Sequence, residues 1–329
     1  MKLFAHMALL AALKERNYRF ITPTPATHAR VVKRKPEAQN LRDVFGWSLP
    51  FAPEIVGEEL LDLMRNADVL EALPNPPFEG ASRRQAQGSA GLSLSKAGGE
   101  MFASAVRVSS LDDDLFLHSA YPTNTQDSVF FGPDSYRFAD FLKRELPRFA
   151  PRQHIVDIGA GSGVGGVIAS RLIEDANVSF TDINPKARNF VQANAIHARI
   201  TGETLFYAGD GLEQVGGRID CVIANPPYIV DAARRAYRDG GALHGAAVSL
   251  DWARQAAERL EPGGVLLLYT GSAIVDGEDE FKAALHETLS GFDINFREID
   301  PDVFGEELER DAYADVERIA VVGVVAVKR

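Results

Sequence analysis

Residues 219–229, Ile219-Asp220-Cys221-Val222-Ile223-Ala224-Asn225-Pro226-Pro227-Tyr228-Ile229, are the stretch from which the rest of the chain is interpreted. The mainly apolar run from Ile219 to Ala224 predicts a short buried strand. Pro226 and Pro227 cannot continue a sheet ladder, so the chain has to leave the sheet there. Asn225 then stands at the carboxyl end of a strand, where open α/β sheets bind their ligands. We therefore expect Asn225 to face a ligand site.

The bulk composition is that of a globular protein with room for more than one domain. The chain has 329 residues and a net charge of −11, which argues against a non-specific nucleic-acid binder but leaves a local basic patch open. Its single cysteine, Cys221, cannot form an intramolecular disulfide, so we expect a reducing, cytoplasmic compartment. No run approaches the roughly 18 apolar residues of a membrane span, and residues 7–13 are expected in an amphipathic helix rather than a signal peptide.

The first part of the chain, residues 1–100, is predicted to be mainly helical and to recognise the substrate. Apolar residues recur at helical spacing in 3–13, in 55–64 and on through 69–73. This region is basic within an acidic chain, which indicates either a contact surface for an anionic partner or simply solvated helix faces. Its cations are Lys14, Arg16, Arg19, Arg30, Lys33, Arg34, Lys35 and Arg42.

A linker and a hairpin are predicted before the second part. Residues 74–100 are rich in Pro, Gly and Ser, which is typical of a flexible linker. They contain a second Asn-Pro-Pro-aromatic string, Asn75–Phe78, which we interpret as a turn because it follows an expected helix end at 70–73. Alternation in 101–108 and 115–119 around an acidic turn predicts a β-hairpin linker at 101–125. A separate domain is expected over 126–329.

In that domain, strands and helices alternate, which predicts a mostly parallel sheet with helices on both faces. The last two strands are close in sequence and are expected to pair antiparallel at one edge. The expected strands are 154–158, 177–181, 204–208, 220–224, 265–270, 292–298 and 319–327. The expected helices are 136–146, 165–174, 186–198, a stretch around Gln214, and 248–260.

A glycine loop follows the first of these strands. Gly159, Gly161 and Gly163 allow the backbone to turn tightly and to approach a ligand closely. Gly161, Gly163 and Gly166 also satisfy the dinucleotide fingerprint, with Asp182 further along, so a nucleotide-dependent oxidoreductase has to be considered.

Acidic residues near three successive strand ends favour S-adenosylmethionine over a dinucleotide. Asp157 lies within the first strand, where its carboxylate would repel a pyrophosphate but could orient the loop or accept from the cofactor's ammonium. Asp182 could bind both ribose hydroxyls, or serve as a helix cap. Asp210, with Gly211, could accept from the adenine amino group, or be a turn residue. Because the cofactor has adenosine and no phosphate, its loop needs close approach rather than an anion nest.

With these residues, 128–329 resembles the class I S-adenosylmethionine-dependent methyltransferases. The string Asn225-Pro226-Pro227-Tyr228 narrows the resemblance to amino and amide N-methyltransferases. The helical N-terminal region, the hairpin and the glycines at 240, 241 and 245 resemble the release-factor glutamine N5-methyltransferases most. The resemblance implies a Rossmann-like, seven-stranded α/β fold and a protein substrate, with a translation factor as one candidate. The chain departs from the group at His244 and in the string 131–136, so it resembles a divergent member.

The resemblance implies a site that aims a poorly nucleophilic nitrogen at the methyl group. The Asn225 side-chain oxygen and the Pro226 carbonyl would accept the two N–H bonds of the substrate, and Tyr228 would stack on its planar group. We expect an N-methyltransferase acting on a protein glutamine, and the alternative keeps the chemistry but takes adenine or guanine in RNA or DNA. A binding module without activity is a further alternative. His244 is either a substrate contact or a surface turn residue, and no metal-ligand spacing occurs.

Overall fold

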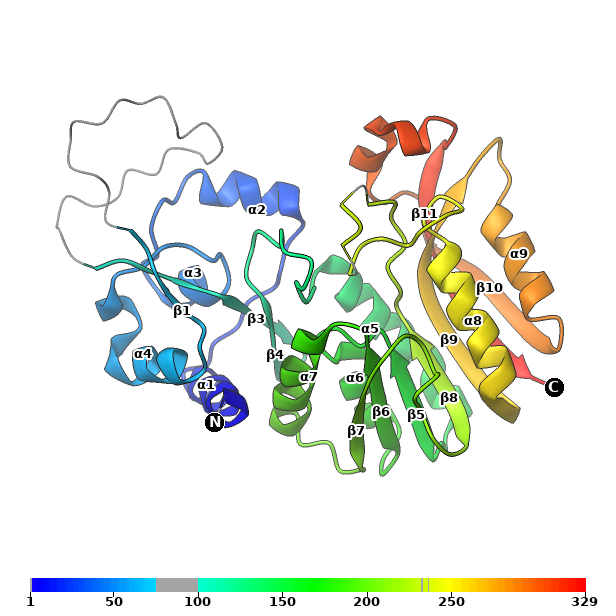
Figure 1. The fold of residues 1–329 in the computed structure, drawn as a ribbon, viewed down its shortest axis with the longest axis horizontal. Helices are drawn as coiled ribbons and strands as arrows, with labels where there is room; N and C mark the ends of the chain where they lie inside the picture. The colour runs from blue at the N-terminus through cyan, green and yellow to red at the C-terminus, as the bar shows by residue number, and fades with distance from the viewer. Residues whose placement is uncertain (1, 75–99, 232, 236) are drawn as a thin grey trace. The chain divides into compact units, whose positions relative to one another are not determined.

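The computed structural model describes residues 2–74, 100–231, 233–235 and 237–329 (Figure 1). The chain divides into two compact units. The first comprises Met1–Asn124 with Phe130–Pro133 and Ile196–Ala198, and the second comprises Thr125–Val129, Asp134–Ala195 and Arg199–Arg329. The linker predicted at 74–100, with its Asn-Pro-Pro-Phe string, lies almost entirely outside the described residues.

The first unit contains helices and short strands. They are α1 (Lys2–Glu15), α2 (Pro25–Val32), α3 (Leu41–Phe45), η1 (Pro53–Ile55), α4 (Gly57–Asn66), β1 (Leu70–Ala72), β2 (Phe102–Ser104), β3 (Val106–Leu111) and β4 (Asp114–Ser119). Helix α1 packs against α4, and each of them buries leucines at helical spacing. Short helices begin at side-chain caps: Thr24 accepts from the Thr27 N–H before α2, and Asn40 does the same for α3.

The predicted hairpin is confirmed, but the helix expected at 69–73 is wrong. Strands β3 and β4 pair antiparallel, with Leu111 opposite Asp114 and a two-residue turn between them. Residues Leu70–Ala72 form β1, which pairs antiparallel with β2. Asp68, at φ 59, turns the chain after α4, and the strand exists because a partner distant in sequence supplies its hydrogen bonds. Local apolar spacing over five residues contains no information about that partner.

The second unit is a seven-stranded sheet with helices. Its elements are α5 (Pro133–Glu145), η2 (Leu146–Phe149), β5 (His154–Ile158), α6 (Val164–Leu172), β6 (Asn177–Asp182), α7 (Pro185–His197), β7 (Thr204–Ala208), β8 (Ile219–Ala224), α8 (Ala247–Arg259), β9 (Leu260–Ile274), α9 (Glu280–Thr288), β10 (Phe292–Asp300), η3 (Gly305–Glu309), η4 (Asp311–Tyr313) and β11 (Arg318–Lys328). The strand order is β10-β11-β9-β8-β5-β6-β7. The pairs between β9, β8, β5, β6 and β7 are parallel, and β11 is antiparallel to β9 and β10.

This sheet confirms all seven predicted strands and the antiparallel edge. Strand β9 is longer than expected because β11 pairs with it as far as Ile274. The helix expected around Gln214 is wrong: residues 211–214 form a turn. Gly211, at φ 60, and Gly217, at φ 75, adopt left-handed backbone conformations that end regular structure on either side of that turn.

The order of the strands creates one point where the sheet reverses direction. From β5 the chain moves outward through β6 and β7, and it then returns to add β8 and β9 on the other side of β5. Helices and loops on both sides of such a switch point leave a crevice at the carboxyl ends of the two central strands. The strands β5 and β8 therefore set the position of any ligand site.

Candidate active site

The glycine loop and the Asn-Pro-Pro-Tyr string begin at the same level of the sheet. Ile158 and Ala224 are register partners in the parallel pair β5–β8. Gly159 and Asn225 are the next residues along each strand, so the two sequence motifs start side by side at the switch point. The sequence predicted a site residue at Asn225, and the sheet register brings it beside the loop.

Backbone conformation accounts for three of the loop glycines. Gly159, Gly161 and Gly163 have φ angles of 62°, 55° and 81°. L side chains rarely adopt this left-handed conformation, so other residues would be strained there. Gly163 directly precedes the first residue of α6, and the loop thus delivers the chain into a helix.

Asp157 is buried beneath this loop. Its side chain is 2% exposed, and its Oδ2 accepts a hydrogen bond from the Gly166 N–H at 2.8 Å. A Cβ at Gly165 would lie 2.6 Å from Asp157 Oδ1, so glycine is needed for this close approach. Burial raises the pKa of Asp157 to about 7, the Gly166 N–H opposes that shift, and the Asp182 charge adds to it. Asp157 therefore orients the start of α6, which is one of the two roles predicted for it.

Asp182 ties the glycine loop to the end of β6. Its Oδ2 accepts from the Gly161 N–H at 2.8 Å, and its Oδ1 accepts from the Asn184 N–H at 2.8 Å. Burial raises the pKa of Asp182, the two N–H groups oppose that shift, and the nearby Asp210 charge adds to it. The helix cap predicted for Asp182 is wrong: Asn184 caps α7, since its Oδ1 accepts from the Lys186 N–H at 3.0 Å, and Asp182 holds the turn before it. Each carboxylate oxygen retains a further lone pair for a ligand hydroxyl.

Asp210 is hydrogen-bonded to Trp252, a residue that the sequence analysis did not single out. The indole N–H of Trp252, on α8, donates to Asp210 Oδ1 at 2.9 Å. The same indole covers Gly159, where a Cβ would lie 2.3 Å from its ring. Trp252 is 6% exposed and joins the glycine loop to the end of β7. A tryptophan in a predicted helix gives no indication of such a role, because helix periodicity shows only that it is buried.

Gly211 is needed for the packing of the segment after β7 against α8. A Cβ there would lie 2.0 Å from Gln255 Oε1, and this same oxygen accepts from the Leu212 N–H at 2.6 Å. The helix α8 thus holds the segment after β7 through both Trp252 and Gln255.

The residues of the Asn-Pro-Pro-Tyr string differ in their exposure. Asn225 is half-buried and Pro226 is buried. Tyr228 is 6% exposed, with its ring against Gly271 and edge-to-face with Phe304 at 5.9 Å between centroids. Little of the ring is free in this conformation, and the stacking role of Tyr228 stays a prediction. Phe304, another residue that the sequence did not single out, lies between β10 and β11 in a left-handed conformation with φ 56.

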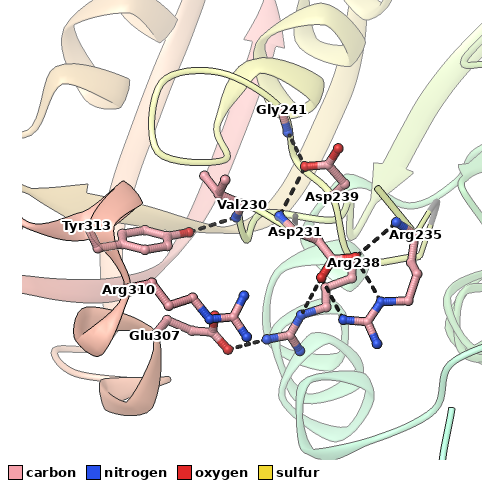
Figure 2. A network of polar contacts seen from close by, with 9 residues as sticks. All are labelled: Val230, Asp231, Arg235, Arg238, Asp239, Gly241, Glu307, Arg310 and Tyr313. Carbon is pink, nitrogen blue, oxygen red and sulfur yellow. Dashed lines mark hydrogen bonds and ion pairs between the residues drawn. The ribbon is translucent and has the colours of Figure 1, made fainter. Parts of the chain in front are cut away.

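A network of polar contacts holds the segment that follows Tyr228 (Figure 2). Tyr313 accepts from the Val230 N–H at 2.8 Å through its hydroxyl, which also lies 3.3 Å from the His244 carbonyl. Buried Asp231 binds Arg235 at 2.6 and 2.8 Å, and these bonds lower the pKa of Asp231 to about 2.

The second buried acid of this network is Glu307. It pairs with Arg238, which also lies 3.7 Å from Asp231, and with Arg310 at 2.9 Å. Figure 2 shows these contacts connecting the loop after β8 to the short helices η3 and η4. Ion pairs therefore join two segments, the loop after β8 and the short helices η3 and η4. Together these segments form what we call the wall beside Tyr228.

His244 has a defined place in the same wall. Its Nε2 lies 3.1 Å from Asp315 Oδ1, and its ring lies beside that of Tyr313 at 6.1 Å between centroids. The sequence left open whether His244 is a substrate contact or a surface turn residue near the site. The structure adds Asp315 as its carboxylate partner.

The described part of the chain contains neither a cluster of metal-ligating side chains nor a helix that could span a membrane. Residues 2–74, 100–231, 233–235 and 237–329 contain no group of three or more His, Cys, Asp or Glu that could hold a metal ion. Within those same ranges, every helix is too short or too polar to cross a bilayer.

Comparison with known proteins identifies the domain that carries this site. The family model of the methyltransferase small domain matches residues 125–287. The release factor glutamine methyltransferase of Koribacter versatilis is 30% identical over 182 residues, 50% of this chain and 61% of that protein. The ribosomal RNA large subunit methyltransferase G of Streptomyces avermitilis is 33% identical over 151 residues, 40% of this chain and 38% of that protein.

Among solved structures, the T. thermophilus 16S rRNA N2 G1207 methyltransferase in complex with AdoMet and guanosine gives a TM-score of 0.44 at 14% identity, over 85% of this chain and 64% of that one. The chain spans less than two thirds of the length of these curated relatives. Residues 125–287 thus match the methyltransferase small domain, and the second unit has the Rossmann-like fold of the S-adenosylmethionine-dependent class I methyltransferases.

Proposed function

We propose that this chain transfers the methyl group of S-adenosylmethionine to a planar nitrogen, with the side-chain amide of a protein glutamine as its acceptor. The observation that carries the proposal is the register of β5 and β8, which sets Asn225 beside Gly159. One edge of the switch point thereby has a loop suited to the cofactor, and the other has acceptors suited to an N–H group.

The residues around the glycine loop fit S-adenosylmethionine. Its ammonium, ribose hydroxyls and adenine amino group are hydrogen-bond donors, and Asp157, Asp182 and Asp210 offer carboxylates near three successive strand ends. Asp157 suits the ammonium, Asp182 the ribose and Asp210 the adenine. When bound, the cofactor supplies an electrophilic methyl group on a sulfonium, so the chain needs no strong base to activate it.

On the acceptor side, the chain positions a nitrogen whose lone pair is delocalised. The Asn225 side-chain oxygen and the Pro226 carbonyl accept its two N–H bonds, which directs the lone pair toward the methyl carbon. The same oxygens stabilise the positive charge that develops on nitrogen as the N–C bond forms and the C–S bond breaks. The nitrogen then loses a proton to solvent. Tyr228 anchors the string, and stacking on the acceptor would require its ring to leave the contact with Gly271.

The glutamine acceptor is favoured by a curated relative and by the net charge of the chain. A curated relative whose name specifies glutamine methylation shares 30% identity with this chain. The acidic character of the chain, at −11, suits a protein partner better than a polyanion.

A nucleic-acid base is the second candidate, and specific cations favour it. Within the described part of the first unit, Arg30, Lys33, Arg34 and Arg42 are exposed and form no ion pair. Other cations there are engaged: Arg16 with Glu59, and Lys35 with Asp43. The four exposed cations could contact phosphates, and acceptor binding that falls steeply with salt concentration would support this candidate.

The experiment is incubation of the purified chain with methyl-labelled S-adenosylmethionine and a cell extract. We expect the label in protein, removed by protease and not by nuclease, and released as methylamine by acid hydrolysis because a methylated amide bond is cleaved. Asn225→Ala is the matched inactive control, and exposed Asn295→Ala is the active one. Label that nuclease removes would select the second candidate, and label in a small molecule would refute both acceptors.

A further inference from the structure

A buried carboxylate outside the predicted site lies next to Tyr228. Asp134, in the first turn of α5, is 6% exposed. Its Oδ1 accepts from the Tyr269 hydroxyl at 3.1 Å and pairs with Arg137 at 3.3 Å, and Arg137 pairs in turn with Asp300 at 3.2 Å. A carboxylate this deeply buried is stable only when donors surround it.

The Tyr228 hydroxyl shares this environment. It is fully enclosed and has no partner at hydrogen-bond geometry among the described residues. Burial raises the pKa of Tyr228 well above its ordinary value, and the nearby Asp134 charge raises it further. Burial also raises the pKa of Asp134, against the opposing effects of Tyr228 and Arg137. The two groups also share β9 as a neighbour, because Asp134 accepts from Tyr269 and the Tyr228 ring lies against Gly271.

Strand β9 fixes the ring to which that hydroxyl belongs. A Cβ at Gly271 would lie 2.2 Å from the Tyr228 ring, so this glycine provides the space that the ring occupies. Gly271 and Tyr269 are two residues apart on β9, so they face the same side of the sheet. The rings of Tyr228 and Tyr269 thus lie on one side of the sheet, and both hydroxyls lie near Asp134.

We propose that Asp134 is a positioning residue for the methyl-transfer site: its carboxylate holds the Tyr228 hydroxyl and so fixes the Asn225 and Pro226 oxygens. This inference rests on the proposed function. It assigns the enclosed Tyr228 hydroxyl a part in turnover. Tyr269 lies outside the string and donates to the same carboxylate, so it helps to hold Asp134 in place.

A double-mutant cycle tests the proposal. Tyr228→Phe keeps the ring beside Gly271 and removes only the hydroxyl, and Asp134→Asn keeps the size of the side chain. We expect each to lower the turnover number about tenfold, with the KM for S-adenosylmethionine changed by less than about twofold. The double variant is expected to lose no more than either single one, because both changes remove the same interaction. Asp140→Asn, at an exposed position on the same helix, is the control and should leave turnover near wild type.

A second readout does not depend on activity. In protein labelled with ¹³C at the tyrosine Cζ, Tyr228→Phe identifies the Tyr228 resonance. Asp134→Asn should shift that resonance, and Asp140→Asn, at an exposed position on the same helix, should not. An unmoved resonance in Asp134→Asn, or additive losses of turnover in the cycle, would overturn the proposal. A wild-type protein that transfers no methyl group while the resonance does shift would instead contradict the proposed function.

Discussion

Ile158 and Ala224 are partners in adjacent parallel strands, and the residues that follow them, Gly159 and Asn225, start the two halves of the candidate site. Neither half is complete without the other. In the proposed function the glycine loop binds the cofactor, and the Asn-Pro-Pro-Tyr string supplies the oxygens that accept from the substrate nitrogen, with Asn225 next to both the cofactor and the nitrogen. Because the two halves adjoin but differ in role, a change in one half should affect cofactor affinity and turnover differently.

Asn225→Ala is expected to leave cofactor affinity within about twofold and to lower turnover about a hundredfold or more. The lost side-chain oxygen stabilises charge that develops only in the transition state. Calorimetric titration with S-adenosylhomocysteine and initial rates of methyl transfer check the two parts. Asn295→Ala, at an exposed position on β10, is the control. Near-normal turnover in Asn225→Ala would contradict the assigned role.

Asp157 should make cofactor binding depend on pH. Its pKa of about 7 means that the ionised carboxylate, which suits the cofactor's ammonium, is scarce at pH 6. The ammonium itself is lost near pH 8, so affinity should peak near pH 7.4, about fivefold tighter than at pH 6.0. The acid side of this profile should be flat in Asp157→Asn, and an unchanged profile would refute the contact.

The raised pKa of Asp157 should also make stability depend on pH. Cofactor affinity should rise between pH 6 and pH 7, whereas stability should fall. Because the pKa of Asp157 is raised in the fold, its neutral form is favoured there, and the free energy of unfolding should fall as pH rises from about 4 to about 7. Asp157→Asn should remove this part of the pH dependence. Denaturant unfolding at pH 5 and pH 7.5 measures it, with the difference between the two proteins as the relevant quantity.

Trp252 should report cofactor binding by fluorescence. Two tryptophans occur in the chain, so Trp47→Phe leaves Trp252 as the single emitter. Since its indole donates to Asp210 and covers Gly159, S-adenosylhomocysteine should change its emission. Trp252→Phe should weaken binding about fivefold, which corresponds to loss of one hydrogen bond. Emission unaffected by a saturating ligand would show that the ligand binds elsewhere.

Glu307→Gln should destabilise the wall beside Tyr228. The guanidinium groups of Arg238 and Arg310 would lose their buried charged partner. Because both arginines reach solvent, we expect a loss of about 1–3 kcal/mol rather than the larger cost of a fully buried pair. Glu309→Gln, exposed in the same short helix, is the matched control in urea unfolding. Equal midpoints for the two variants would show that the ion pairs do not stabilise the fold.

Tyr313→Phe should affect turnover more than cofactor binding. Its hydroxyl accepts from the Val230 N–H, two residues after Tyr228, and loss of that bond frees the chain that carries the Pro226 carbonyl. We expect a threefold to tenfold lower rate of methyl transfer with unchanged S-adenosylhomocysteine affinity. Tyr207→Phe, on β7, is the comparison, and a parallel loss of affinity in Tyr313→Phe would contradict the assignment.

The sequence by itself determined the seven strands of the second unit, the glycine loop and the strand end at Asn225. These features depend on residues close together in the chain: apolar runs define strands, glycines permit left-handed turns and prolines end a ladder. The sequence also placed Asp157, Asp182 and Asp210 near successive strand ends, since parallel strands share one carboxyl edge.

Only the tertiary structure decided which side chains meet at that edge. Trp252 reaches Asp210 across 42 positions, and Tyr269 reaches Asp134 across 135. The same holds for β1, which is a strand only because β2 lies beside it. Such contacts arise from the packing of elements distant in the chain, and local periodicity shows that a residue is buried but not what it is buried against.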